Sequence, residues 1–351
     1  MLKSISTFAL LTQRSANLRA MEADLARTGE ELASGKKSDL ASQIREETPV
    51  LIGLRGKYSE NEALLQSINT FERRTEIMSA AMAEIESALN SVVENTVLNT
   101  PDAGASVGTL NLAAKTAIEQ LVDALNTNVD GRFVFSGVDI DVSPFHRLDE
   151  PSPISGLTPA QVVSAVMDGT AYTPVQPPAF SLYSAAEAAT AITRFDELFD
   201  GTHAALPPPS NEYSFERSFY DGAVGGPRTS IRLSDGAPLE YGASGDDSAF
   251  RNAMQGLYML ASIDMNALAG TPAYEPFVTA ALDRLTGAQD AVRAAAAELG
   301  GVQNAIEDRK AALENQNVIL NIQINAYEQA DPIETQTRFA EIEKQLDAAY
   351  A

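Results

Sequence analysis

The prolines of this chain divide it into three parts. Twelve of the 17 prolines lie between Pro144 and Pro238, and five lie elsewhere. Proline inside a helix removes a hydrogen bond and clashes with the preceding turn, so long helices are expected outside this middle region. The two ends are also rich in Ala, Leu, Glu and Gln, which favour helix. The sequence therefore predicts two helical arms that bracket an inserted segment.

The N-terminal arm carries apolar residues in steps of three and four, the spacing of a heptad seam. We expect helices over residues 15–33, 50–98 and 107–128, with a loop over residues 38–49. At 1.5 Å per residue the second helix would be about 70 Å long. Gly35 suits a C-terminal cap of the first helix. The seam of the first helix comprises Leu18, Met21, Leu25, Thr28 and Leu32, and that of the second Leu64, Ile68, Phe71, Thr75, Met78, Met82, Ile85, Leu89 and Val92.

The C-terminal arm shows the same periodicity. We expect helices over residues 248–267, 277–329 and 333–349, the last one after an Asp331-Pro332 start signal. Helices of this length with apolar heptads need partners along their whole length, so the two arms are expected to pack together. The seam of the long helix comprises Leu285, Val292, Ala295, Leu299, Val302, Ile306, Leu313 and Leu320, and that of the last helix Phe339, Ile342 and Leu346.

The expected fold is mainly α, an elongated bundle of long heptad helices from both termini with an inserted, mostly β domain. The insert begins after the turn signal Asp130-Gly131 and contains Gly/Pro turns with short apolar runs. We expect it to fold as a unit, so that a short linker could replace residues 146–228 without unfolding the bundle. The expected parts are an N-terminal helical assembly segment 1–40, a helical shaft 41–131 and 246–330, the insert 132–245, and a C-terminal helical assembly segment 331–351.

Composition excludes several classes of function. The formal net charge is −23, which argues against binding nucleic acid or an anionic membrane surface. The absence of cysteine excludes disulfides, Cys-ligated metals and thiol nucleophiles. The N-terminus lacks the apolar core and cleavage site of a secretory signal, and no apolar run approaches the roughly 20 residues of a membrane span. We expect a protein that is cytoplasmic or leaves the cell without a cleaved signal.

Residues that could support catalysis are scarce. The two histidines, His146 and His203, lie in Pro-rich loops and are expected to be ordinary surface residues. Helical zinc-protease and nucleophile-elbow motifs are absent. Asp246 and Asp247 precede the helix expected at residue 248, where they suit its N-terminus better than a metal. The sequence therefore predicts no catalytic residue, cofactor or metal, and hence no enzyme.

Two terminal segments resemble the flagellin superfamily. Residues 31–37 read ELASGKK and are similar to its Leu-Ser-Ser-Gly-Lys segment, and residues 297–307 read AELGGVQNAIE and are similar to its Leu-Gly-x-x-Gln-Asn-x-x-Glu helix. Finding both at opposite ends of one chain is more specific than either alone. Residues 45–50 depart from the pattern, since REETPV stands where flagellins usually carry Asp-Asp-Pro-Ala-Gly.

Two further segments resemble the branch of this superfamily that joins hook to filament. Residues 130–137 read DGRFVFSG and are followed by Ser-Pro-Phe at 143–145, and residues 331–350 match the ending of that branch. The resemblance implies a structural axial protein, located outside the cell in the flagellum at the hook–filament junction. It also implies export through the flagellar type III apparatus without a cleaved signal. Filament flagellin, or a non-flagellar coiled-coil adaptor, are the alternatives.

The resemblance also implies partners. They are other copies of the chain in a ring, the first hook-associated junction protein, flagellin, and a cytoplasmic export chaperone at the C-terminal helices. The terminal seams are expected to be poorly buried in the monomer and buried in the assembly. The expected assembly interface comprises Leu18, Met21, Leu25, Leu32, Leu299, Val302, Ile306, Phe339, Ile342 and Leu346.

Overall fold

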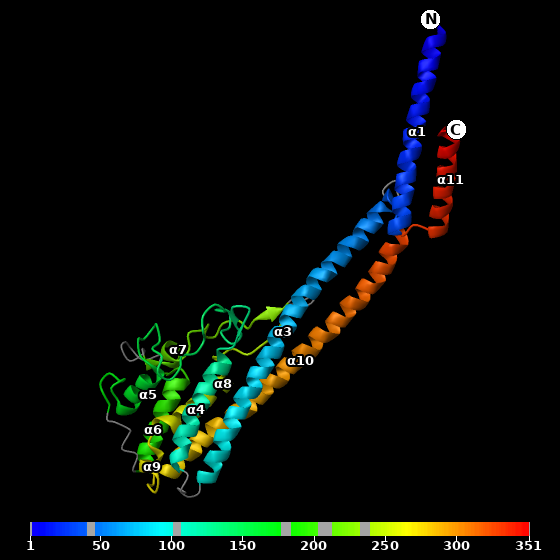
Figure 1. Cartoon of the computed structure of the whole chain (residues 1–351). Coiled ribbons are helices and arrows are strands. Elements are labelled where there is room, and N and C mark those ends of the chain that lie inside the picture. The colour runs from blue at the N-terminus through cyan, green and yellow to red at the C-terminus, as the bar shows by residue number, and fades with distance from the viewer. Residues whose placement is uncertain are drawn as a thin grey trace. The chain divides into compact units, whose positions relative to one another are not determined.

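The computed structural model describes residues 2–40, 46–100, 107–176, 184–202, 213–231 and 239–350, and its helices are labelled in Figure 1. Its helices are α1 (Leu2–Ser34), α3 (Thr48–Asn99), α4 (Val107–Leu125), α5 (Pro159–Asp168), α6 (Ala185–Phe199), α7 (Phe215–Ser218), α8 (Ser248–Ser262), α9 (Met265–Leu268), α10 (Tyr274–Glu328) and α11 (Pro332–Tyr350). Its strands are β1 (Asn128–Val129), β2 (Arg132–Phe133), β3 (Ser230–Ile231) and β4 (Leu239–Glu240), in two antiparallel pairs, β1–β2 and β3–β4.

The chain divides into two compact units. Met1–Gln66 and Lys310–Ala351 form one, here called the terminal unit, and Ser67–Arg309 form the other, here called the central unit. Each unit therefore contains part of α3 and part of α10. In the terminal unit Asn61 donates a hydrogen bond from its amide to Asn317 at 3.0 Å, and in the central unit Arg293 pairs with Glu86 at 2.6 Å. The prediction that the two arms partner each other is confirmed within each unit.

The long helices follow the sequence prediction closely. Most seam residues of α3 and α10 are buried, with Leu64, Phe71 and Ala295 partly buried. α1 begins at Leu2 instead of residue 15. The helix expected over 248–267 is broken at Ile263, whose backbone is extended, and Asp264 then caps α9 by accepting hydrogen bonds from two backbone N–H groups.

The expectation of a mostly β insert is wrong for the residues that the structure describes there. They form helices α5, α6 and α7, while the strands are two residues long. Pro159 occupies the first turn of α5, where a proline costs no hydrogen bond, and Thr158 and Gln161 form a capping box. Ser184 and Glu187 form a second capping box at α6. Pro159, in a region where the sequence indicated Gly/Pro turns, therefore starts a helix.

In the part of the insert that the structure describes, no separate hydrophobic core is present. The insert's helices α5, α6 and α7 contribute to one buried cluster with α3, α4, α8 and α10. The Phe199 ring of α6 lies 6.0 Å from the Tyr258 ring of α8, and the Phe195 ring lies 6.3 Å from that of Phe277 in α10. Because the core is shared, the expectation that the insert folds separately is not supported by the packing.

The turn predicted at Asp130-Gly131 is present, whereas the surface position predicted for His146 is wrong. Asp130 and Gly131 both have positive φ, 54° and 82°, as a two-residue type I′ hairpin requires. His146 was expected at the surface, but it is buried with its Nε2 atom 2.9 Å from Asp221 Oδ2. His203 lies outside the described residues.

Candidate assembly surface

The segment ELASGKK forms a chain reversal in the terminal unit. Gly35 ends α1 with φ of 68°, a left-handed conformation that glycine adopts without strain. The Glu31 carboxylate accepts hydrogen bonds from the backbone N–H and hydroxyl of Ser38, both at 2.9 Å. The backbone N–H of Lys37 donates to Glu328 at 2.9 Å, and that of Ala330 donates to Gly35 at 3.0 Å. These bonds fix the end of α1 beside the end of α10.

Glu328 is the central charged residue of this reversal. Its side chain is buried, and its carboxylate contacts Arg55 Nη2 at 2.6 Å and Lys36 Nζ at 3.2 Å. Burial alone would raise the pKa of Glu328, but the hydrogen bonds and charges of Arg55 and Lys36 outweigh it and lower the pKa below its ordinary value. The carboxylate therefore stays ionised and joins α10 to both α3 and the segment after α1.

The Glu328 contacts give a pH-dependent stability. Because folding lowers the pKa of Glu328, these contacts stabilise the fold fully at pH values above the unfolded-state pKa of roughly 4.3. This stabilisation is lost as the pH falls through the folded-state pKa. We expect Glu328→Gln to lower the free energy of unfolding of the terminal unit by about 1 kcal/mol at pH 7, since both basic partners are more than half exposed. This change in the free energy of unfolding can be measured by denaturant unfolding, with hydrogen exchange as the readout.

The control for this variant is Glu314→Gln, an exposed position on the same helix. We expect Glu314→Gln to change stability by less than about 0.5 kcal/mol. The difference between the two variants should shrink as the pH is lowered below 4. An equal loss in both variants, or a loss that grows on acidification, would contradict the assigned role of Glu328.

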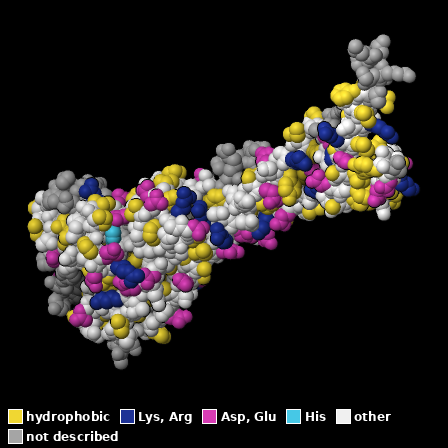
Figure 2. Space-filling model, turned by 45° about the horizontal axis from the view of Figure 1, so that its top comes forward, with side chains coloured by type: hydrophobic (Ala, Val, Ile, Leu, Met, Phe, Trp, Pro, Cys, Tyr) yellow, Lys and Arg dark blue, Asp and Glu magenta, His cyan; other side chains and the backbone are white. Residues whose placement is uncertain are grey.

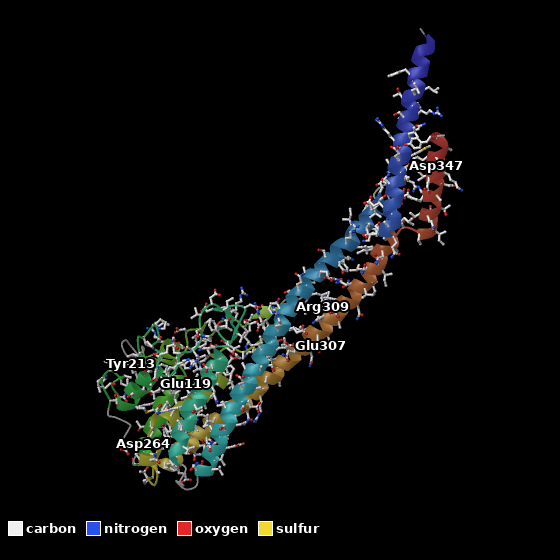
Figure 3. The ribbon with its side chains drawn as sticks, viewed as in Figure 1. Glu119, Tyr213, Asp264, Glu307, Arg309 and Asp347 are labelled. Atoms are coloured by element: carbon white, nitrogen blue, oxygen red, sulfur yellow. The ribbon has the colours of Figure 1, made fainter. Side chains whose placement is uncertain are left out.

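Helices α1 and α11 pack antiparallel from this reversal. A Cβ atom placed on Gly29 would lie 3.3 Å from Cε2 of Phe339, so glycine allows a close approach there. At the far end of α11 the Tyr350 hydroxyl hydrogen-bonds Glu22 of α1. Figure 3 labels Asp347 near this end of α11. The predicted seam residues that share this packing are half-buried, namely Leu18, Met21, Leu25, Phe339, Ile342 and Leu346.

The register of α1 differs from the prediction at its C-terminal end. Thr28 and Glu31 are buried, whereas Leu32 is 43% exposed. The Thr28 hydroxyl donates to the Asp24 carbonyl at 2.7 Å, and Glu31 accepts from Ser38, so both polar side chains are satisfied where they are buried. Leu32 consequently remains available on the outer surface of the helix.

Gly29 offers a direct test of the α1–α11 packing. We expect Gly29→Leu to push the two helices apart and to cost about 1–3 kcal/mol of local stability, because the added side chain meets the Phe339 ring. The control is Gly56→Leu in α3, where an added Cβ meets nothing within 4 Å. That variant should instead gain about 0.5–1 kcal/mol from helix propensity.

Amide hydrogen exchange of α1 and α11 measures both variants. The expected result is faster exchange in both helices for Gly29→Leu and unchanged or slower exchange for Gly56→Leu. Equal protection of the two helices in the Gly29 variant and the unaltered chain would mean that the packing does not hold in solution.

Apolar side chains remain uncovered elsewhere in the terminal unit. At 1.5 Å per residue the 33 residues of α1 span about 50 Å and the 19 of α11 about 28 Å, so α11 covers only part of α1. The first part of α1 continues past the end of α11 in Figure 1, and hydrophobic side chains are visible on this part of the surface in Figure 2. Among the described residues of the unit, the exposed large hydrophobic ones are Phe8, Leu10, Leu11, Leu32, Val50, Ile52, Val318, Ile319, Ile322, Ile333 and Tyr350.

Leu32 was predicted to belong to the assembly interface, whereas the other exposed residues were missed because they lie off the heptad seams or in short runs. Conversely, the predicted interface residues Leu299, Val302 and Ile306 are buried within the central unit. A side chain that the chain itself buries offers no surface to a partner. The candidate assembly surface therefore consists of the half-buried α1–α11 seam and the exposed hydrophobic residues of the terminal unit.

Metal sites and membrane spans are not evident in the described residues. No three His, Cys, Asp or Glu side chains come together there in a way that could hold a metal ion. No described helix is long and apolar enough to cross a membrane.

A chain whose two ends pair as helices while large apolar side chains stay exposed has the construction of an assembly subunit. Residues 5–139 match the family model of the bacterial flagellin N-terminal helical region, and residues 282–351 match that of the C-terminal helical region. The two matches together cover more than half of the 351 residues. The chain belongs to the bacterial flagellin family, whose members are exported structural components that assemble in the flagellum.

One solved structure shows the same fold at low sequence identity, and a second is reported beside it. A protein described as flagellar hook-associated from Vibrio parahaemolyticus superposes with a TM-score of 0.54 and 10% identity, over 82% of this chain and 99% of that one. Bacillus cereus FlgL gives a TM-score of 0.48 and 14% identity, over 79% of this chain and 99% of that one. No curated protein sequence matches this chain.

Proposed function

We propose that this chain is the axial subunit that joins hook to filament. The observation that carries the proposal is the terminal unit, where paired helices α1 and α11 stand beside apolar side chains that none of the described residues cover. Exposed apolar surface of this kind marks a site of protein association. The function is structural and requires no catalytic group.

The choice of the junction over the filament rests on two segments. Residues 130–137 and 331–350 resemble the junction branch, and the Vibrio parahaemolyticus protein of the same fold is described as hook-associated. In this chain Phe135 and Phe145 are fully buried, and the backbone N–H of Gly245 donates to the Phe135 carbonyl at 2.7 Å. The DGRFVFSG segment therefore anchors the start of the insert to its end.

Position and copy number distinguish the alternatives. Antibody labelling of purified flagella should mark one short zone between hook and filament, with few copies per flagellum. Labelling along the whole filament would instead identify a filament flagellin. Absence from the flagellar fraction, with the protein in the cytoplasm, would support a coiled-coil adaptor.

The proposed partners follow from this position. They are other copies of the chain in a ring, the first hook-associated junction protein on one side and flagellin on the other. Before export, a cytoplasmic chaperone would cover the C-terminal helices, because exposed apolar surface promotes aggregation. Deleting residues 331–351 should then abolish co-purification of a chaperone, and undiminished co-purification would place its binding site elsewhere.

A further inference from the structure

A pocket of about 380 Å³ lies in the central unit among α3, the β1–β2 region and the segment that leads into β3. Its wall is partly apolar, with Met78 and Phe133 among its residues. Three arginines, Arg74, Arg132 and Arg228, also line it, together with the hydroxyl-bearing Tyr241. The chain has only 25 basic residues against 48 acidic ones. Three arginines around one pocket are therefore a local concentration of positive charge in an acidic protein.

The three arginines differ in whether a carboxylate of the chain lies close enough to pair with them. Arg228 lies at 3.4 Å from Asp247 and 3.5 Å from Glu298, two long contacts. In the described part of the chain no carboxylate lies within ion-pair distance of Arg132 or Arg74. Arg74 contacts the face of Phe71, with 5.6 Å from its guanidinium carbon to the ring centre, and its Nε–H is buried without an acceptor. Two guanidinium charges at the pocket, those of Arg74 and Arg132, are therefore not matched by a carboxylate among the described residues.

Tyr241 adds a neutral polar group to the same wall. Burial raises the pKa of its hydroxyl, against the opposing effects of the hydrogen bond from Arg74 and the charges of Arg74 and Arg132. Because its pKa is raised, the hydroxyl keeps its proton at pH 7 and can donate it to a ligand. The edge of the Phe71 ring packs against Tyr241, with ring centres 5.4 Å apart, which holds both aromatic side chains in place.

We propose that this pocket binds a carboxylate carried on an apolar or aromatic body. The guanidinium groups of Arg74 and Arg132 bind the carboxylate, since arginine presents paired N–H donors that match its two oxygens. The apolar wall around Met78 and Phe133 buries the body of the ligand. The pocket volume lies in the range of roughly 300–1,000 Å³ that holds small organic molecules.

The test uses the full chain at pH 7 with 2-naphthoate as the probe and 2-naphthamide, its neutral isostere, as the comparison. Isothermal titration should show saturable binding of 2-naphthoate with a Kd below about 1 mM, a binding free energy of about 4 kcal/mol. The amide should bind at least tenfold more weakly. Arg132→Gln should weaken naphthoate binding about tenfold, and because Arg132 is exposed this change spares the fold.

The matched control is Arg147→Gln, an arginine of the central unit that is paired with Glu119 and Asp123 away from the pocket. It should leave the Kd unchanged. Equal affinity for the amide and the acid, an unchanged Kd in Arg132→Gln, or no binding of naphthoate at millimolar concentration would overturn the proposal.

The carboxylate could belong to a free organic acid or to an acidic side chain of a second copy of the chain. Sedimentation of the concentrated protein separates these sources. If a second copy supplies it, 2-naphthoate and Arg132→Gln should both weaken self-association; a free acid as the source predicts no change in sedimentation. Both outcomes retain the carboxylate site that the titration establishes, and neither depends on the chain being a junction protein.

Discussion

A variant in which a short flexible linker replaces residues 146–228 is expected to lose the cooperative fold of the central unit. The replacement removes α5, α6 and α7, which fill one side of the core shared with α8 and α10. It would expose Tyr258 and Phe277, both fully buried in the intact chain and packed against rings of the removed segment. Burying side chains of this size contributes about 1.5–3 kcal/mol each, a large fraction of the 5–15 kcal/mol that stabilises a typical domain.

Circular dichroism and denaturant unfolding measure this outcome. The expected result is loss of more helical signal than the removed residues account for, together with loss of the cooperative transition of the central unit. A variant that keeps its remaining helix and unfolds cooperatively would show that the insert is a separate domain after all.

Phe199→Ala tests the same shared core with a single substitution. The ring is buried and packs against Phe215, Phe219 and Tyr258 at 5.8, 5.1 and 6.0 Å between ring centres. We expect a loss of about 3–5 kcal/mol, the usual cost of removing a buried aromatic ring. The matched control is Phe8→Ala, an exposed phenylalanine of α1, which should cost less than about 0.5 kcal/mol.

The second large effect concerns assembly instead of folding. Replacing Phe8, Leu10 and Leu11 with serine should leave the stability of the monomer nearly unchanged, because all three side chains are more than 60% exposed. If they are buried between subunits, each contributes about 1.5–3 kcal/mol to assembly. Their combined loss of about 5–9 kcal/mol would weaken subunit association by roughly three orders of magnitude or more, at about 1.4 kcal/mol for each factor of ten. Cells that carry the triple variant should therefore not swim.

Leu112→Ser provides the control for this variant, since Leu112 is equally exposed but lies on α4 in the central unit. Motility should persist in this control. Assaying each protein in the culture medium separates failed assembly from failed export. Normal swimming of the triple variant would remove these residues from the assembly surface.

The sequence could predict the long helices because the apolar spacing that produces them is contained within each helical segment. Stripes such as Ile68 to Val92 in α3 repeat over many turns, and a helix with such a stripe must bury it. Sequence reasoning failed where burial depends on a distant partner. Leu299, Val302 and Ile306 have the pattern of an interface, but the central unit buries them itself. The buried pair of His146 with Asp221, 75 positions away, leaves no local signal at all.

The insert shows a different kind of limit. Its prolines suggested turns and strands, yet Pro159 begins a helix, since the first turn tolerates a residue without an N–H. Within the assembly surface, spacing assigned Leu32 to the buried seam of α1. The structure buries Glu31 instead, and its carboxylate accepts a hydrogen bond from the backbone N–H of Ser38. A polar side chain with a specific backbone partner outweighs apolar periodicity there, and spacing alone does not reveal such a partner.

A clean deletion of the gene tests the central claim most directly. We predict cells with complete hooks and no filaments that do not swim and that release unpolymerised flagellin into the medium, with filaments restored by the intact gene in trans. Those results would follow because flagellin is still exported but has nothing to assemble on. Deletion cells that swim with normal filaments, or that lack filaments because flagellin itself is no longer detectable in the cell or the medium, would contradict a junction role.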